Sequence, residues 1–430
     1  MNALAFALAL ALLFVWSLPG TIALRWLLLL GALAVLGVAL ARGDWRRIGR
    51  AAPLPLALVA GLTLWLLGQA AWLAAEPAWS LDELRGQWLP ALLALLLGLM
   101  LAARVAHLAT AVVLVFAAQA ALAVGHSVWH GFVHGELLTM LVPLTGGKLE
   151  MSFVLNLLLA FVTVDLFCRV SHRAPLSRLP LAAVLGILLL ALSGSLLAGA
   201  RNGIIGILFL VFSAVSLFVV DQRHRLGPLR TLAAAAAIIA TLAAFATISY
   251  RADPRWPAFA ETATIAWDID CHSTWLDTSR HPWPKLGNGL DVEYSAYTRI
   301  AFIHGGLRLI AEHPLGYGYG RNAFAHALRQ QYPEARLGHA HSGWIDLGVG
   351  GGVPALLLWA AVLGSLMWRG WRAFFGGGNA HGLVLFFLAT GYAGRMVLDS
   401  VNKDHLLQMF LFLAGILLVA TAPGREADTA

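Results

Sequence analysis

Residues 179–220 have the sequence LPLAAVLGILLLALSGSLLAGARNGIIGILFLVFSAVSLFVV, in which Arg201 is the one charged residue. Arg201 separates two apolar runs, residues 179–199 and 202–220. At a rise of 1.5 Å per residue, runs of about 20 residues match the roughly 30 Å hydrocarbon layer of a bilayer. Because lipid satisfies no backbone N–H or C=O group, both runs are predicted to be transmembrane helices.

The same pattern recurs along the whole chain. Of its 430 residues, 60% are hydrophobic and only 12% are charged, which excludes a water-soluble globule with one ordinary core. About twelve apolar runs are present: 3–18, 21–41, 52–74, 88–103, 105–125, 150–168, 179–199, 202–220, 229–249, 343–367, 381–398 and 405–421. The sequence therefore predicts an all-α polytopic membrane protein with about twelve transmembrane helices.

One long polar interval divides the chain into three parts. Residues 1–249 are expected to hold transmembrane helices one to nine, and residues 343–430 helices ten to twelve with a short cytoplasmic tail. Between them, residues 250–342 are expected to form a large periplasmic loop region that contains short helices. The first run lacks a basic leader and a small-residue cleavage site, so we expect it to be retained.

Basic residues indicate the orientation in the membrane. If the N-terminus is cytoplasmic, the cytoplasmic turns hold Arg42, Arg46, Arg47, Arg50, Arg104, Arg169, Arg173, Arg178, Arg223, Arg225, Arg230, Arg369 and Arg372. The opposite short loops hold little beyond Arg85, Lys148 and Lys403, so the positive-inside rule places both termini in the cytoplasm of a bacterium and the long loop in the periplasm. The net charge of +7 then reflects topology and contact with anionic membrane lipids, and no nucleic-acid partner is expected.

A row of histidines precedes the run that begins at residue 150. His126, His130 and His134 have four-residue spacing, which would align them on one face of a short helix, as in some metal sites. Trp129 and Phe132 lie between them and favour an amphipathic helix at the membrane interface. We expect the interfacial helix, and metal binding is the alternative.

The long loop contains enough Trp and Tyr to form a small core or a sugar-stacking surface, which argues against disorder. Residues 291–311 have the apolar pattern of an amphipathic helix. Residues 315–320, Leu-Gly-Tyr-Gly-Tyr-Gly, are predicted to form a tight turn in preference to a phosphate cradle. Residues 268–270, Asp-Ile-Asp, resemble a divalent-metal pair, although such short acidic pairs arise easily by chance.

Two arginines and a histidine carry the chemistry that we expect. An Arg201 guanidinium at the edge of the bilayer is costly unless it reaches the interface or finds an anion, and a lipid pyrophosphate would be such an anion. Arg299 lies on the predicted loop helix and could reach the same anion. His341 stands just before an apolar helix, whose positive end would keep the imidazole neutral and able to accept a proton. His339 and His341 could instead share a metal, but no carboxylate at suitable spacing completes such a site.

The residues around these three positions resemble the O-antigen ligase and Wzy-type polymerase superfamily of membrane glycosyltransferases. The resemblance rests on Ala-Arg-Asn-Gly at 200–203, on Arg299 followed by Glu-His-Pro-Leu-Gly at 312–316, and on His-Ser at 341–342 followed by Gly-Val-Pro-Ala at 352–355. Ala355 is a mild departure, because the family often has Gly there.

The resemblance implies a GT-C-like membrane enzyme that transfers a glycan from undecaprenyl pyrophosphate to a sugar hydroxyl, without a metal or another cofactor. By motif position, His341 would be the general base, and Arg201 and Arg299 would bind the pyrophosphate. Accessory candidates are His339, which is also a rival base, and Asn202, His313 and Arg395. Arg395 and Asp399 are spaced for an ion pair along a helix, so a structural role is favoured there.

The acceptor distinguishes the activities within this superfamily. A ligase would use lipid A-core, and a polymerase another undecaprenyl-linked repeat. One dominant loop and a chain that ends soon after its last run favour the ligase. A lipid-linked glycan transporter is a further alternative, but the sequence shows no convincing internal repeat, and its polar candidates gather at one face.

Overall fold

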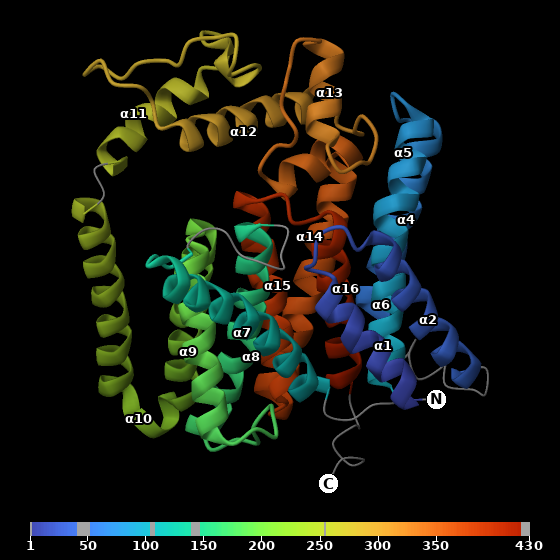
Figure 1. The fold of residues 1–430 in the computed structure, drawn as a ribbon, viewed down its shortest axis with the longest axis vertical. Helices are drawn as coiled ribbons and strands as arrows, with labels where there is room; N and C mark the ends of the chain where they lie inside the picture. Colours follow the sequence, from blue (N-terminus) through green and yellow to red (C-terminus); the bar gives the residue numbers. More distant parts are fainter. Residues whose placement is uncertain (1, 41–51, 104–107, 139–146, 253–254, 423–430) are drawn as a thin grey trace.

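The computed structural model of the chain describes residues 2–40, 52–103, 108–138, 147–252 and 255–422 (Figure 1). Within these ranges the protein is built of helices and loops. The elements are α1 (Asn2–Val15), α2 (Ile22–Leu40), α4 (Pro53–Trp72), α5 (Pro77–Glu83), the π-helix η1 (Leu84–Trp88), α6 (Leu89–Ala102), α7 (Leu108–His134), α8 (Lys148–Val170), α9 (Leu181–Ala198), α10 (Arg201–Ala252), α11 (Arg255–Trp267), the 3₁₀-helix η2 (Ser273–Trp275), α12 (Tyr294–Glu312), α13 (Ala323–Gln331), α14 (Gly343–Gly377), α15 (Ala380–Leu398) and α16 (Asp404–Ala420).

Apolar helices make up most of the molecule and confirm a multi-pass membrane protein. Among the described residues, eight helices are long and apolar enough to cross a bilayer, and three more apolar helices are shorter. Every predicted apolar run overlaps one of the described helices. The number of twelve spans stays a prediction. The predicted run at 229–249 forms the second half of α10, and only the first half of α10 is among the eight helices that could cross a bilayer.

A break divides α10 into two halves. Gly227 has φ 74°, a left-handed conformation that glycine adopts without steric cost, and Pro228 follows it. The chain therefore turns back at this point, and the second half of α10 runs towards α11 (Figure 1).

Glycines allow the closest helix pairs of the bundle. A Cβ on Gly98 of α6 would collide with the carbonyl oxygen of Phe412 in α16, and one on Gly415 would collide with the carbonyl of Leu95. Small residues at such crossings let two backbones approach, which is how helices pack in membranes. The helix α16 is consequently fixed in the middle of the bundle, and the loop before it has a defined position.

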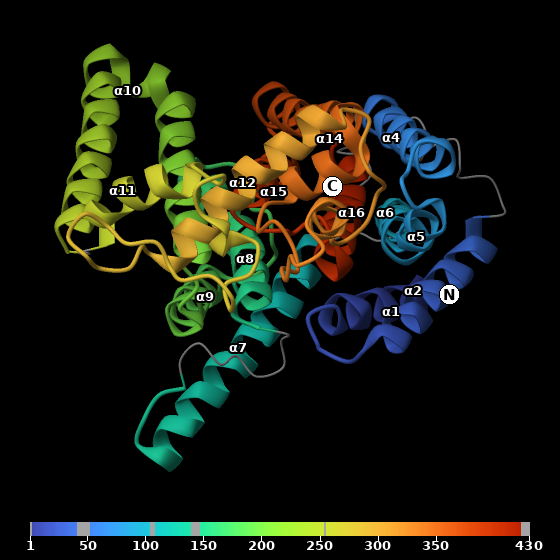
Figure 2. The same cartoon turned by 90° about the horizontal axis from the view of Figure 1, so that it is seen from above.

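Residues 255–342 fold over one end of the bundle around a core of their own. Trp275, Tyr297 and Phe324 are buried in this core, which confirms that aromatic residues of the loop pack together. The predicted helix at 291–311 is present as α12, which lies across the ends of α14 and α15 when the molecule is viewed from above (Figure 2). The N-terminal end of α1 and the C-terminal end of α16 lie at the face of the bundle that is far from α12 (Figure 1).

The glycine-rich segment after α12 is joined to α14 through backbone atoms. The backbone N–H groups of Tyr317 and Gly318 donate to the carbonyls of Val349 and Gly350, each at 2.9 Å. Gly352 has φ 74° and breaks α14 there, and a Cβ on Gly352 would collide with the backbone of this segment. These glycines permit close contact between two main chains, and the N–H groups of Tyr317 and Gly318 are used in that contact.

Candidate active site

The loop from His339 to Ser342 leads directly into α14. His341 has φ 54°, a left-handed conformation that is uncommon for a residue with a side chain. Ser342 Oγ donates a hydrogen bond to the Met396 carbonyl at 3.1 Å, and the Gly343 N–H donates to the Asp399 carbonyl at 3.0 Å. The end of α15 therefore holds the backbone that carries His341.

Two aromatic rings border the imidazole of His341. The Phe302 ring of α12 is nearly parallel to it, with an interplanar angle of 4° and ring centroids 6.1 Å apart. The ring of His339 lies on another side, with centroids 4.2 Å apart. His341 is thus enclosed between α12 and its own loop, although part of the ring stays accessible.

The surroundings of both histidines favour the neutral imidazole. Burial is the first cause that lowers the pKa of His341, the charge of Arg299 lowers it further, Asp399 opposes the shift and Lys403 adds to it. Burial, then Lys403 and then His341 lower the pKa of His339 to about 3. The sequence predicted a neutral His341 from the dipole of α14, whereas in the structure burial and the neighbouring guanidinium are the leading causes.

Arg299 lies on the second turn of α12 and is close enough to His341 to act on its pKa. Its Nη1 donates to Ser295 Oγ at 2.7 Å. Its Nε is buried without a hydrogen-bond partner in the described part of the chain. A buried guanidinium N–H without an acceptor is costly, so this group is suited to receiving an anion.

The helix α10 begins at Arg201, as predicted, but the side chains of Arg201 and Asn202 lie outside the described residues. The backbone of this turn can be placed, because a Cβ on Gly203 would collide with Ser152 of α8. Ser152 Oγ accepts a hydrogen bond from Arg395 Nη1 at 3.1 Å. The first turn of α10 therefore lies close to Arg395.

Arg395 is buried near the end of α15 and forms the predicted helical ion pair. Its Nη2 lies 3.5 Å from Asp399 Oδ2 and donates to the Leu149 carbonyl at 2.9 Å. The guanidinium also lies 5.7 Å from the ring centre of Phe153. These contacts tie α15 to α8 and support the structural role, although Nε has no hydrogen-bond partner among the described residues.

An apolar cavity of about 180 Å³ opens between α8, α10 and α15. Residues that line it include Phe153 and Leu157 of α8, Ile205 and Phe209 of α10, and Arg395. Ile205 lies one helical turn after Arg201. The cavity thus has an apolar interior with one guanidinium in its wall, and it starts next to the turn that carries Arg201.

Sequence reasoning did not predict how the loop after α15 holds the histidine loop. Asp346, buried in α14, accepts hydrogen bonds from Ser400 Oγ at 2.5 Å and from the Ala340 N–H at 3.4 Å. Asn402 Nδ2 donates to the Gly343 carbonyl at 3.1 Å. The carboxylate of Asp346 inside an apolar run was the one sequence signal for this contact. Its partner Ser400 lies 54 residues further along the chain, so the contact itself could not be predicted.

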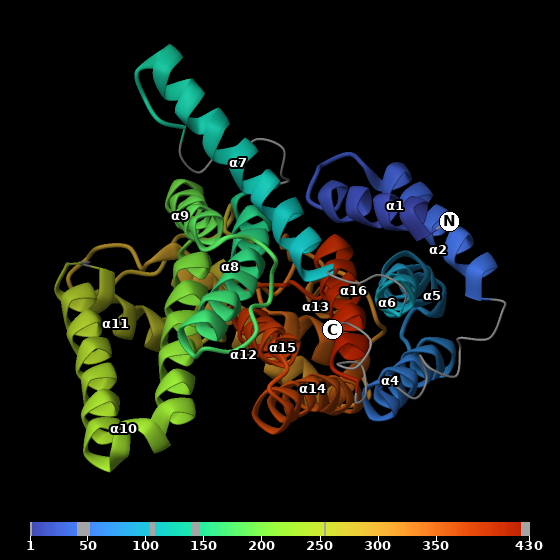
Figure 3. The same ribbon diagram turned by 90° about the horizontal axis from the view of Figure 1, so that it is seen from below.

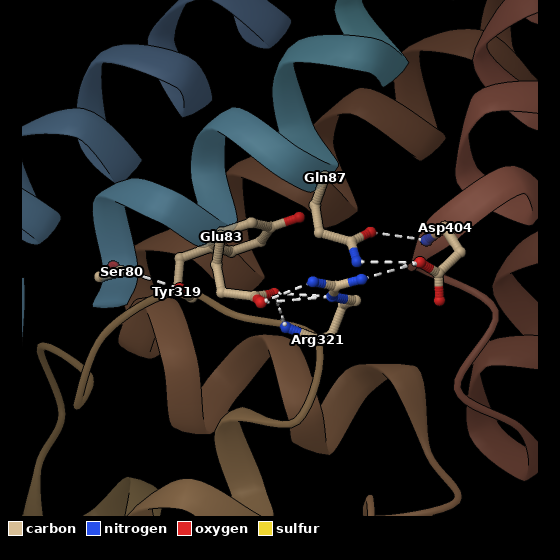
Figure 4. A network of polar contacts seen from close by, with 6 residues as sticks. All are labelled: Ser80, Glu83, Gln87, Tyr319, Arg321 and Asp404. Carbon is tan, nitrogen blue, oxygen red and sulfur yellow. Dashed lines mark hydrogen bonds and ion pairs between the residues drawn. The ribbon is translucent and has the colours of Figure 1, made fainter. Parts of the chain in front are cut away.

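A second polar cluster, also not predicted, surrounds Arg321 (Figure 4). Arg321 pairs with Glu83 at 2.9 Å and with Asp404 at 3.4 Å. Gln87 of η1 donates to Asp404 Oδ1 at 3.2 Å and accepts from the Asp404 N–H at 2.6 Å. This cluster joins η1 to the start of α16, where Asp404 has φ 49°.

His313 is exposed at the C-terminal end of α12 and packs against Tyr317, with ring centroids 4.2 Å apart. It follows Arg299 by 14 residues, which along a helix is roughly 20 Å. Its position therefore indicates a role in ending α12 and gives no support to a place beside His341.

The metal alternatives receive no support in the described ranges, where no group of three or more potential ligands lies together. Asp270 of the acidic pair forms a two-pronged ion pair with Arg308, at 2.7 and 2.8 Å. His130 and His134 lie on the part of α7 that extends away from the bundle (Figure 3), where Phe132 is 84% exposed. An interfacial role for α7 stays a prediction.

The fold and the site define a multi-pass helical membrane protein in which His341, the partly buried Arg299 and the buried Arg395 lie at one end of the bundle. A family model described as O-antigen ligase matches residues 181–360, which include Arg201, Arg299 and His341. This match confirms the resemblance found in the sequence and supports an O-antigen ligase family assignment for this region, which implies a glycosyltransferase-like ligase or polymerase activity. No curated protein matches the chain.

Proposed function

We propose that the protein is an O-antigen ligase of the bacterial inner membrane. It transfers O-antigen glycan from undecaprenyl pyrophosphate to a sugar hydroxyl of lipid A-core, with its active site at the periplasmic face and both termini in the cytoplasm. The observation that carries this proposal is the neutral His341 beside Arg299, whose Nε is buried without a partner in the described structure. The arginine distribution supports the orientation, because the C-terminal end of α8 and the break in α10 lie opposite α12 (Figure 1), and Arg169, Arg173 and Arg230 are close to these two places in the sequence.

His341 acts as the general base. As the acceptor hydroxyl oxygen forms a bond to the anomeric carbon of the donor, its proton passes to the imidazole, and the bond from that carbon to the pyrophosphate oxygen breaks. The electron pair leaves with undecaprenyl pyrophosphate, and attack opposite the leaving group inverts the anomeric centre. General-base catalysis of this kind contributes about 10²- to 10⁴-fold in rate.

Arg299 and Arg201 bind the pyrophosphate and stabilise the charge that develops on it. A partly buried guanidinium interacts with phosphate oxygens more strongly than an exposed one, because little water screens the charge. The Nε of Arg299 supplies one donor that is already desolvated. Arg201 begins the helix whose next turn lines the apolar cavity. The reaction therefore requires no metal ion.

The cavity between α8, α10 and α15 suits part of the donor's polyprenyl chain. Its wall is mostly apolar, and it begins next to the turn that carries Arg201. A lipid that enters here would place its pyrophosphate at the polar end of the bundle and its chain among Phe153, Leu157 and Phe209.

Transfer by purified protein tests this function. With a synthetic undecaprenyl-pyrophosphate glycan and rough lipopolysaccharide, the native protein should form a smooth-type product without energy input, and His341→Ala should lose about 10²- to 10⁴-fold of the rate. His134→Ala is the control, because this exposed histidine lies on α7, away from the site. Near-native transfer by His341→Ala overturns the assignment of the base. If the glycan is transferred only to another lipid-linked glycan and not to lipopolysaccharide, the protein is a polymerase.

A further inference from the structure

A second, smaller pocket lies on the other side of the loop before α16. It has a volume of about 80 Å³ and is lined by residues of α2, η1, α6 and α16 together with Arg321. Viewed from below, α2 and α6 lie on one side of α16, and α8 and α10 lie on the other (Figure 3). The two cavities are therefore separate and border opposite sides of the bundle.

The residues of this pocket combine an aromatic ring with mixed hydrogen-bonding groups. Trp26 supplies the ring, and Arg25, Asp404 and Gln408 supply donors and acceptors. Sugars present hydroxyl groups on their edges and C–H groups on their faces, so a Trp surrounded by both donors and acceptors suits a sugar better than it suits a bare anion.

Several of these side chains are already oriented. Arg25 donates from Nε to Thr21 Oγ1 at 3.0 Å and from Nη2 to the Leu18 carbonyl at 2.6 Å. Gln408 accepts from Trp16 Nε1 at 2.8 Å, which fixes the direction of its amide NH₂. Groups held in this way lose little conformational entropy when a ligand binds.

His405 gives an independent indication of a ligand. Its side chain lines the pocket, and its Nε2 is buried without a hydrogen-bond partner in the described residues. A buried polar atom without a partner costs free energy, so a ligand hydroxyl group that reached Nε2 would remove that cost.

The pocket is also connected to the histidine loop through a short segment, residues 399–404. The Asp399 carbonyl accepts from the Gly343 N–H at one end of this segment, and Asp404 lines the pocket at the other. The five residue-to-residue steps from Asp399 to Asp404 span at most roughly 17 Å. Lys403, next to Asp404, is close enough to His339 and His341 to lower the pKa of each.

We propose that this pocket binds a sugar of the membrane-anchored acceptor glycolipid, while the donor lipid occupies the cavity on the opposite side. The inference rests on the proposed transfer reaction and assigns its second substrate. Separate cavities on opposite sides of α16 would let donor and acceptor bind together. The position of Trp26 on the second turn of α2 places the ring near the membrane surface, where the head group of a glycolipid lies.

Two-substrate kinetics test the proposal in the full-length protein. Trp26→Ala should raise KM for rough lipopolysaccharide about five- to tenfold, the loss expected for one aromatic contact, and leave kcat and the donor KM unchanged. Trp26→Phe should restore most of the acceptor affinity. The matched control is Trp72→Ala, because Trp72 is 84% exposed at the end of α4 and lies outside both cavities.

Binding without turnover supplies a second measurement. Lipid-free core oligosaccharide should raise the Tm of the native protein and of Trp72→Ala, but not that of Trp26→Ala. An unchanged acceptor KM, a raised donor KM, or a fall in kcat alone would overturn the acceptor pocket. If His341→Ala is inactive while Trp26→Ala behaves as native protein, only this inference fails. If His341→Ala retains transfer, the proposed function itself fails.

Discussion

Arg299 and Arg321 both lie on the polar side of the bundle, yet their surroundings differ. Arg321 pairs with two carboxylates, those of Glu83 and Asp404. Arg299 donates to the neutral Ser295 and has a buried Nε without a partner among the described residues. A guanidinium with matched carboxylates stabilises the fold, whereas one with an unused buried donor is suited to an anionic ligand.

Replacing Arg299 should have the largest effect on catalysis. Arg299→Ala removes a donor to the pyrophosphate, so the transfer rate should fall about 10²- to 10³-fold, the range for removing one preorganised donor to a developing anion. Its Tm should stay near that of the native protein, since the broken hydrogen bond to Ser295 is replaced by one to water. Rate and melting measurements on the same sample check both points. A large fall in Tm with only a small loss of rate would make Arg299 a structural residue.

Replacing Arg321 should give the opposite result. Arg321→Ala leaves Glu83, whose side chain is 13% exposed, without its cation, and should lower the free energy of unfolding by about 1–2 kcal/mol after allowance for the half-exposed arginine. Transfer in membranes should fall less than tenfold. Thermal unfolding in detergent measures the first effect. A native Tm combined with a severe loss of transfer would show that Arg321 acts through the pocket that it lines and not through the stability of the fold.

The pH dependence of transfer sharpens the comparison further. Because burial and Arg299 lower the pKa of His341 below its usual value, the base is neutral at pH 7, and activity should be lost only as the pH falls through that lowered pKa. Arg299→Gln removes one cause, so the pKa should rise and the acid limb of the remaining activity should move to higher pH. Arg321→Ala is the control and should keep the native limb. An acid limb that stays in place in Arg299→Gln contradicts the proposed coupling.

The smallest effect is expected at the exposed ion pair between Asp270 and Arg308. Asp270→Asn should leave the transfer rate unchanged, because this carboxylate is paired with an arginine at the surface of the loop region. Chelation with EDTA should also leave the rate of the native protein unchanged. If EDTA removes activity and Mg²⁺ or Mn²⁺ restores it, the reaction depends on a metal and the proposed mechanism is wrong.

The sequence predicted the local features of this molecule well. Runs of about 20 apolar residues can bury their backbone only as helices, so the helices at 179–199 and 202–220 followed from composition alone. The amphipathic pattern at 291–311 likewise predicted α12. His341 was selected as the candidate base because it directly precedes an apolar helix and lies in a family motif.

Contacts between distant segments could not be predicted in this way. Arg321 meets Glu83 across 238 residues, and no local pattern specifies such a pair. The lowered pKa of His341 was attributed to the helix dipole, because burial and the approach of Arg299 depend on how α12 folds over α14. The glycines at 316 and 318 were predicted to form a turn, but the contact of this segment with the break in α14 requires the tertiary structure.

The central claim is that His341, and not its neighbour His339, accepts the proton. Single-turnover transfer by purified His341→Ala and His339→Ala, with the protein in excess over the donor, compares the two imidazoles directly. The account predicts a loss of about 10²- to 10⁴-fold for His341→Ala and less than tenfold for His339→Ala. Near-native transfer by His341→Ala, together with a severe loss in His339→Ala, would contradict it.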